Sequence, residues 1–176
     1  KVSKGNENTA VFYSISNCQK GLKGISFGNF LIKQVANAIR TDYPNIKDFV
    51  TLSPVPGFMD WLELNNNKLF KSIDNGQFIN ETDEYKDDIL KNSLDYFFNS
   101  ERSDKLPNDS VARFHLGNGA LIEDIIVNAN ISETGFRRSF GVMVNYLYEL
   151  KSIEKNHEDY INNKRVIISD KLKKFI

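Results

Sequence analysis

A short apolar segment, a basic loop with glycines and a long amphipathic segment follow one another between Thr9 and Asp42. The apolar segment, Thr9 to Ser16, is typical of a strand, and the loop reads QKGLKG from Gln19 to Gly24. Glycine removes the Cβ that would block a close approach, and the N–H groups of a first helical turn have no partner within the helix. A strand, a glycine loop and a helix in this order therefore predict an anion site, for which phosphate is the natural ligand.

The residues after this loop repeat with the spacing of an amphipathic helix that ends near Asp42. Pro44 supports this end, because proline disfavours helical geometry at the residue before it. Residues 48–53 (DFVTLS) are typical of a second strand, so the strand, helix and strand predict a right-handed unit with two parallel strands. The apolar residues that we expect on the buried face of the helix are Phe27, Phe30, Leu31, Val35, Ala38 and Ile39.

The rest of the chain mixes helical and strand patterns, which predicts an α/β fold in one domain over 9–176. Residues 1–8 are polar and are expected to be a tail or a cut linker. Residues 65–83 predict a surface connection, and 120–128 fits either a helix or a strand. The other predicted elements are a rigid turn at 53–57 followed by a helix from Phe58, a helix over 83–98, a strand over 111–116, a short helix over 132–140, a strand over 142–150 and a terminal helix over 158–175.

The charge is balanced, with 23 basic and 23 acidic residues among 176, so nothing favours nucleic acid or an anionic membrane as a partner. No apolar run approaches the ~20 residues of a membrane span, and no signal segment opens the sequence. Together with the single cysteine, Cys18, this predicts a soluble cytoplasmic protein. The last residues, KKFI, differ from the SKL type of peroxisomal signal.

Ser53 and His115 are the candidate reactive residues, because each is expected at the end of a predicted strand, where open α/β sheets bind ligands. A purely structural role remains open for both, since serine forms turns and a lone histidine is often a hydrogen-bonded structural residue. His157 is expected to be a solvated helix residue. One cysteine and two distant histidines offer no ligand spacing for a metal, and the loop matches neither the Walker nor the GxGxxG pattern.

Four segments, FYSISNCQKGLKGISFGNFLIKQV, TLSPVPGF, ARFHLGNGA and NYLYEL, resemble the catalytic domain of the malonyl-CoA decarboxylase family in order and spacing. The resemblance runs from about Val11 to Leu150. It implies a fold like that of the GNAT-type acyl-CoA N-acyltransferases, a mixed sheet flanked by helices, in which the glycine loop holds the pyrophosphate of coenzyme A. QKGLKG matches the signature of that superfamily only in part. The family also has a helical amino-terminal domain and early strands, so the resemblance implies a chain that is incomplete at its N-terminus.

The resemblance also implies roles for single residues. Ser53 would be the proton acceptor of the family and His115 its proton donor, with Tyr148 near them. Ser26 departs from the family, in which an acidic residue commonly stands there, so any carboxylate contribution from this position is in doubt. The residues implied to bind malonyl-CoA are Gln19, Lys20, Gly21, Lys23, Gly24, Ile25, Ser26, Phe27, Gly28, Asn29, Ser53, His115 and Tyr148.

The implied reaction is the decarboxylation of malonyl-CoA to acetyl-CoA and carbon dioxide, a carboxy-lyase activity of fatty acid metabolism. It needs no metal and no cofactor beyond the coenzyme A of the substrate. Two alternatives stay open, an acyl-CoA N-acyltransferase and a non-catalytic remnant that binds coenzyme A. A homo-oligomer is compatible with the resemblance, and a eukaryotic source would allow the mitochondrial matrix in place of the cytoplasm.

Overall fold

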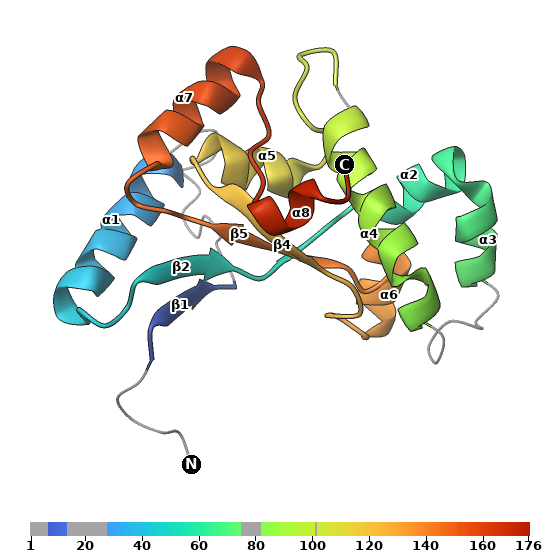
Figure 1. Cartoon of the computed structure of the whole chain (residues 1–176), viewed down its shortest axis with the longest axis horizontal. Helices are drawn as coiled ribbons and strands as arrows, with labels where there is room; N and C mark the ends of the chain where they lie inside the picture. The colour runs from blue at the N-terminus through green and yellow to red at the C-terminus, as the bar shows by residue number, and fades with distance from the viewer. Residues whose placement is uncertain (1–6, 14–27, 75–81, 101) are drawn as a thin grey trace, which may run out of the picture.

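The computed structural model describes residues 7–13, 28–74, 82–100 and 102–176 (Figure 1). The predicted anion-binding loop, Gln19 to Gly24, and Cys18 lie outside these residues. The elements, in chain order, are β1 (Thr9–Phe12), α1 (Gly28–Asp42), β2 (Asp48–Thr51), β3 (Ser53–Pro54), α2 (Phe58–Asn65), α3 (Asn67–Asp74), α4 (Thr82–Asn99), α5 (Ser110–Gly117), β4 (Leu121–Ile126), α6 (Glu133–Ser139), β5 (Met143–Leu147), α7 (Ile153–Asn163) and α8 (Asp170–Lys173).

The strands form one mixed sheet in which β5 has the most neighbours. β1 pairs with β2 in parallel, as predicted, while β2, β3 and β4 are all antiparallel to β5. The pairs Val50–Leu147 and Ser53–Val144 belong to one antiparallel register, so β3 continues β2 along the same neighbour. The mixed sheet confirms the predicted class, and it brings the end of β2 and the start of β3 next to β5.

Helices surround this sheet in two groups. Figure 1 shows α1 and α7 together at one end of the sheet, and α2, α3, α4 and α6 together at the other. Lys33 on α1 and Glu154 on α7 form an ion pair, which is solvent-exposed and therefore stabilises the structure little. The helix predicted over 83–98 is confirmed as α4, and its apolar side faces the core. The buried residues of this side include Ile89, Leu90, Leu94 and Phe97.

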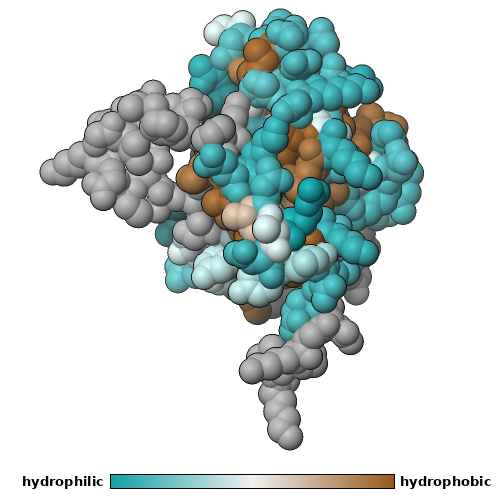
Figure 2. All heavy atoms as spheres, turned by 90° about the vertical axis from the view of Figure 1, so that its left-hand side faces the viewer, coloured by the Kyte–Doolittle hydropathy of each residue, from teal (hydrophilic) through white to brown (hydrophobic). Residues whose placement is uncertain are grey.

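The helix predicted after the glycine loop is confirmed as α1, but its buried face agrees with the predicted one only at Ile39. Ile32 and Ala36 are buried and Ile39 packs against the core, whereas Leu31 and Val35 are 51% and 38% exposed. Both stripes have helical spacing, and only the position of the helix against the sheet selects one of them. Figure 2, which views the end with α1 and α7, shows mainly hydrophilic residues on this face with apolar patches between them.

Two predictions were wrong, one of a connection without a helix and one of a single terminal helix. Residues 65–83, predicted as a surface connection, contain the helix α3, in which Leu69 is buried. The predicted terminal helix over 158–175 is divided into α7 and α8. Lys164 ends α7 in the left-handed conformation, and Ile168 then pairs with Ile122 of β4, so the chain between the two helices borders the sheet. The ambiguous segment 120–128 forms β4.

The predicted strand over 111–116 is the helix α5, so His115 lies on a helix and not at the end of a strand. Two local features explain why this segment is helical. Asp109 is the N-cap, and its carboxylate accepts a hydrogen bond of 2.7 Å from the backbone N–H of Ala112. Ala112, His115 and Leu116 are buried at the i, i+3 and i+4 spacing of one helical face.

Candidate active site

Three side chains that the sequence singles out meet in the structure. The Oγ of Ser53 lies 3.1 Å from Nε2 of His115, and the Oη of Tyr148 lies 2.7 Å from Nδ1 of the same ring. Ser53 begins β3, His115 lies on α5 and Tyr148 directly follows β5, and each is at most 6% exposed. A serine hydroxyl, an imidazole and a phenol therefore form one continuous hydrogen-bonded group.

The helix α5 places His115 within this group. Its inward face packs on β4, so the imidazole reaches the side of the sheet where β3 and β5 pair. At its C-terminus the N–H of Asn118 donates to the carbonyls of Phe114 and His115, at 3.1 Å each, and the N–H of Gly119 donates to Leu116. Both ends of this short helix are therefore held by hydrogen bonds, which fixes the depth of His115.

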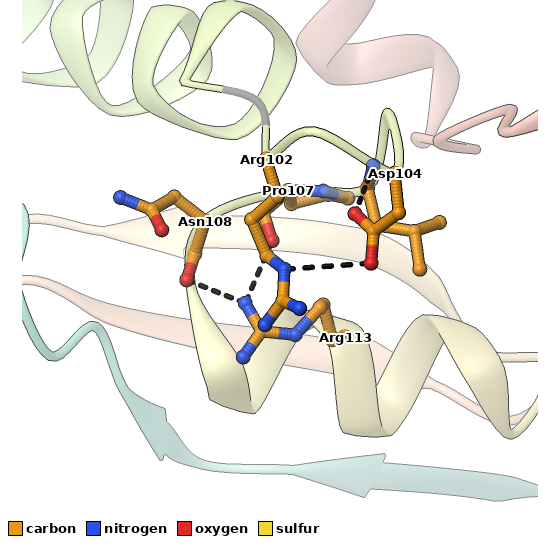
Figure 3. Close-up of polar contacts among 6 residues, drawn as sticks. Arg102, Asp104, Pro107, Asn108 and Arg113 are labelled. Carbon is orange, nitrogen blue, oxygen red and sulfur yellow. Dashed lines mark hydrogen bonds and ion pairs between the residues drawn. The ribbon is translucent and has the colours of Figure 1, made fainter.

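The loop before α5 is anchored to the helix itself. Arg113 donates from Nη1 to the carbonyl oxygens of Pro107 and Asn108, at 2.9 and 2.6 Å, and Arg102 forms an ion pair of 3.4 Å with Asp104 (Figure 3). Because this loop leads directly into the N-cap, its anchoring helps to set the orientation of α5 at its N-terminus.

Ser53 is held from the strand side by Thr51, a residue that the sequence reasoning missed. The Oγ of Ser53 lies 2.9 Å from the Oγ1 of Thr51, within hydrogen-bond distance, and the backbone N–H of Tyr146 donates to the same threonine oxygen at 3.2 Å. Thr51 is completely buried. The sequence could have indicated Thr51, because side chains two residues apart in a strand point to the same face of the sheet, and Thr51 is two residues before Ser53.

Tyr146 forms the floor under the imidazole. Its ring lies nearly parallel to that of His115, with centroids 4.5 Å apart and an angle of 22°. Burial among these groups lowers the pKa of His115 to about 4, so the imidazole is neutral at pH 7. Burial also raises the pKa of Tyr148, so its phenol keeps its proton. The reactive group is therefore neutral throughout.

A cavity of about 340 Å³ opens in front of Ser53 and His115. It lies at the end of β1 and next to the first turn of α5, and its wall is polar and apolar in similar measure. Such a cavity offers a reactant a small, partly enclosed space with the Ser53 hydroxyl and the His115 imidazole at its wall. The lining residues are Phe12, Tyr13, Leu52, Ser53, Pro54, Ser110, Val111, Phe114 and His115.

The remaining predicted binding residues are only partly within the described structure. Gly28 and Asn29 begin α1, while residues 19–27 lie outside it. His157, expected in solvent, is partly buried on α7, where its Nδ1 lies 2.6 Å from the carbonyl oxygen of Gly117. In the described part of the chain no three His, Cys, Asp or Glu side chains are grouped so as to hold a metal ion. None of the described helices has the length and apolar character of a membrane span.

Known proteins resemble this chain over most of its length. The family model described as the C-terminal domain of malonyl-CoA decarboxylase matches residues 1–176. The mitochondrial malonyl-CoA decarboxylases of Anser anser anser and Rattus norvegicus are 34% and 31% identical, over 96% and 93% of this chain. The chain spans 40% of the length of each of these two relatives.

Solved structures agree with these relatives. The malonyl-CoA decarboxylases of Rhodopseudomonas palustris and Agrobacterium vitis have TM-scores of 0.86 and 0.87 and are both 42% identical over 96% of this chain. The matched part is 42% and 45% of those two chains. This similarity confirms the expected GNAT-like mixed sheet flanked by helices. The chain belongs to the malonyl-CoA decarboxylase family and corresponds to its C-terminal domain.

Proposed function

We propose that this chain carries the catalytic site for the decarboxylation of malonyl-CoA to acetyl-CoA and carbon dioxide. The single observation that supports this most is the contact of 3.1 Å between Ser53 and His115 at the cavity wall. The two side chains are 62 residues apart in sequence, yet they meet at an opening large enough for a short acyl group. The names of the relatives point to the same reaction.

The reaction suits the neutral serine, histidine and tyrosine that the described residues bring together. The bond between the α-carbon and the carboxylate of the malonyl group breaks, and its electron pair moves into the thioester to form an enolate, while carbon dioxide leaves. The α-carbon then takes up one proton and becomes the methyl group of acetyl-CoA. The protein must therefore orient the carboxylate, stabilise the enolate and deliver a proton.

His115 is the proposed proton donor. A neutral imidazole is a weak acid and becomes imidazolate when it loses Nε2–H, but the enolate carbon is a stronger base than imidazolate, so transfer of the proton to carbon is favourable. Water restores the proton after release of the product. A positioned general acid of this kind contributes about 10²–10⁴-fold to the rate.

Ser53 is proposed to contact the departing carboxylate and to hold its plane perpendicular to the thioester. In that orientation the breaking bond overlaps with the π system that receives its electrons. This refines the role of proton acceptor that the family resemblance implies for Ser53. Tyr148 is proposed to orient the imidazole, since its hydroxyl contacts Nδ1.

Coenzyme A is proposed to bind with its pyrophosphate at the loop between β1 and α1. Two facts support this: β1 ends at the cavity, and α1 begins directly after the loop, so that the N–H groups of its first turn, which have no partner within the helix, lie next to it. Ser26 places a hydroxyl rather than a carboxylate in the implied binding segment.

We expect the protein to act in the cytoplasm, or in the mitochondrial matrix if the source is a eukaryote.

The test is release of carbon dioxide from malonyl-CoA labelled at the free carboxylate, with no amine acceptor present. We expect His115→Ala and Ser53→Ala to lower kcat by about 10²–10⁴-fold while the dissociation constant of coenzyme A stays within a few fold. Thermal unfolding of each variant supplies the control for folding. Equal losses of stability and activity would leave both residues with structural roles only. Acyl transfer only to an added amine would favour the N-acyltransferase alternative, and coenzyme A binding without turnover would favour the non-catalytic one.

A further inference from the structure

We infer that Tyr146 is a positioning residue whose ring, stacked on the imidazole of His115, holds that imidazole in the plane in which Ser53 and Tyr148 contact its two nitrogens. The hydroxyl of Tyr146 takes no part in this role. The consequence for catalysis rests on the proposed function, whereas the order of the imidazole can be measured in the protein without substrate.

Tyr146 lies at a well-supported place in the sheet. β5 has β4 as one neighbour and β2 followed by β3 as the other, and the N–H of Tyr146 donates to Oγ1 of Thr51 at 3.2 Å. The side chain of Tyr146 is completely buried. A buried ring on a strand with neighbours on both sides has little freedom to move, so it can act as a fixed surface for a second ring.

The imidazole of His115 is contacted on its edge and on its face from the same segment of chain. Tyr146 and Tyr148 are two residues apart in extended chain, so their side chains point to the same side of the sheet. The Oη of Tyr148 lies 2.7 Å from Nδ1, at the edge of the imidazole. The ring of Tyr146 lies against the face of the imidazole, with centroids 4.5 Å apart and planes at 22°.

The contact on the face restrains a motion that the contacts at the edge do not. Ser53 and Tyr148 restrain Nε2 and Nδ1, but the imidazole can still tilt about the line through these two nitrogens. A ring packed against the face opposes that tilt. Phe114 adds a contact of edge to face, with centroids 5.1 Å apart and planes at 82°. Of these aromatic rings, only that of Tyr146 lies nearly parallel to the imidazole.

The ring of Tyr146 makes this contact without help from its hydroxyl. Oη of Tyr146 is buried and has no hydrogen-bond partner within the part of the chain that the structure describes. Burial lowers the pKa of His115 to about 4, so at pH 7 the stack joins two neutral rings and is not a cation–π contact. Phenylalanine should therefore replace Tyr146, whereas leucine, which is apolar but has no ring face, should not.

Tyr146 can affect the reaction only through His115, because it is not among the residues that line the cavity. A misplacement of about 1 Å in a reacting group can cost about 10²-fold in rate. Loss of the stack should therefore slow the transfer of the proton from His115 and leave the binding of the substrate nearly unchanged.

The first experiment is NMR of the full protein with ¹³C-labelled histidine, with His115→Asn used for assignment. Protons above the face of an aromatic ring are shifted upfield, so we expect the ring protons of His115 to move downfield in Tyr146→Leu. We also expect ¹³C relaxation to show a more mobile imidazole in Tyr146→Leu, and an imidazole as ordered as in the unaltered protein in Tyr146→Phe. Ring protons of His115 that do not move in Tyr146→Leu would show that the two rings are not stacked, which would overturn the inference.

The second experiment is steady-state decarboxylation of malonyl-CoA by the same variants. We expect Tyr146→Leu to lower kcat about 10- to 100-fold with KM within about twofold, and Tyr146→Phe to keep kcat within about twofold. An unchanged kcat in Tyr146→Leu would contradict the inference. So would an equal loss of kcat in Tyr146→Phe, because the hydroxyl would then be the active part. If Tyr146→Leu does not fold, Tyr146→Met replaces it in both experiments, since methionine fills irregular space without a ring face.

Tyr160 on α7 supplies the matched control. It is 2% exposed, and its Oη also has no hydrogen-bond partner among the described residues, but none of the ring contacts described for His115 involves it. Tyr160→Leu should therefore lower the stability while the order of the imidazole stays the same and kcat stays within about twofold. Equal losses of kcat in Tyr160→Leu and Tyr146→Leu would mean general loosening and would overturn the inference. An ordered, stacked imidazole in a protein without decarboxylase activity would contradict the proposed function alone.

Discussion

Gly119 follows the helix that carries His115 and leaves it in a conformation that other residues rarely adopt. Its φ is +81°, and a Cβ added there would lie 2.1 Å from the carbonyl oxygen of Ile153, at the start of α7. The substitution Gly119→Ala therefore meets two obstacles, the left-handed backbone and a contact far shorter than real Cβ atoms make. We expect it to destabilise the turn that holds α5 against α7.

The magnitude follows from the two obstacles. The left-handed conformation costs an alanine about 1–2 kcal/mol. Opening the turn enough to relieve the overlap costs about 1–3 kcal/mol more, as other overpacked sites do. Asn156, which donates to the carbonyl of Gly119 at 3.2 Å, would lose part of its hydrogen bond in the process. We therefore expect the free energy of unfolding to fall by about 2–5 kcal/mol.

Gly117 provides a matched control two residues earlier. Its φ is not positive, and an added Cβ would meet only Cε1 of Tyr160 at 3.7 Å, an ordinary contact. Gly117→Ala should therefore change the free energy of unfolding by less than about 1 kcal/mol, in either direction. Urea unfolding followed by circular dichroism measures both variants. Equal stabilities of Gly119→Ala and Gly117→Ala would refute the reasoning about this turn.

Two further predictions concern the pH dependence of buried groups. Burial raises the pKa of Asp109 to about 6, so the native state holds its proton more tightly than the unfolded state, and stability falls as pH rises from about 4 to 6. Asp109→Asn keeps an N-cap oxygen without the charge, so its free energy of unfolding should exceed that of the unaltered protein by up to about 3 kcal/mol above pH 6, and the two should converge near pH 4. Urea unfolding at each pH checks this, and a constant difference would contradict it. Burial lowers the pKa of His115 to about 4, so the imidazole stays neutral well below pH 6.5 and kcat/KM should show no change centred on pH 6.5. A change centred on 6.5 would mean that the imidazole has its ordinary pKa in the working protein.

Much of the fold could be predicted because the signals for it are local. The parallel pair β1 and β2 with α1 between them follows from apolar segments, a helical repeat and a proline. These signals follow one another directly in the sequence. The helix α4 could be predicted for the same reason. A segment whose apolar pattern fits both a strand and a helix could not be assigned in this way. Residues 111–116 alternate like a strand, but Asp109 is an N-cap and Ala112 and His115 are buried on one helical face, so the segment is a helix.

The candidate site was predictable in its members and not in its geometry. Ser53 and His115 were predicted from expected strand ends, a reason that was wrong for His115, and the resemblance to the decarboxylase family supplied Tyr148. No local pattern shows how the elements that carry these residues lie relative to one another. Thr51 and Tyr146 escaped notice because a threonine and a tyrosine in strands are ordinary residues there. Their roles emerge only when β2, β3 and β5 lie side by side.

The sequence by itself determined which residues could react and the local order of strand, loop and helix, since periodicity, proline and glycine act over a few neighbouring residues. Only the tertiary structure decided that Ser53 and Tyr148, 62 and 33 residues from His115, contact the two nitrogens of one imidazole. That decision depends on the packing of α5 against β4 and on the pairing of β3 with β5. Contacts of this kind depend on the summed burial of many side chains, which no single stretch of sequence contains.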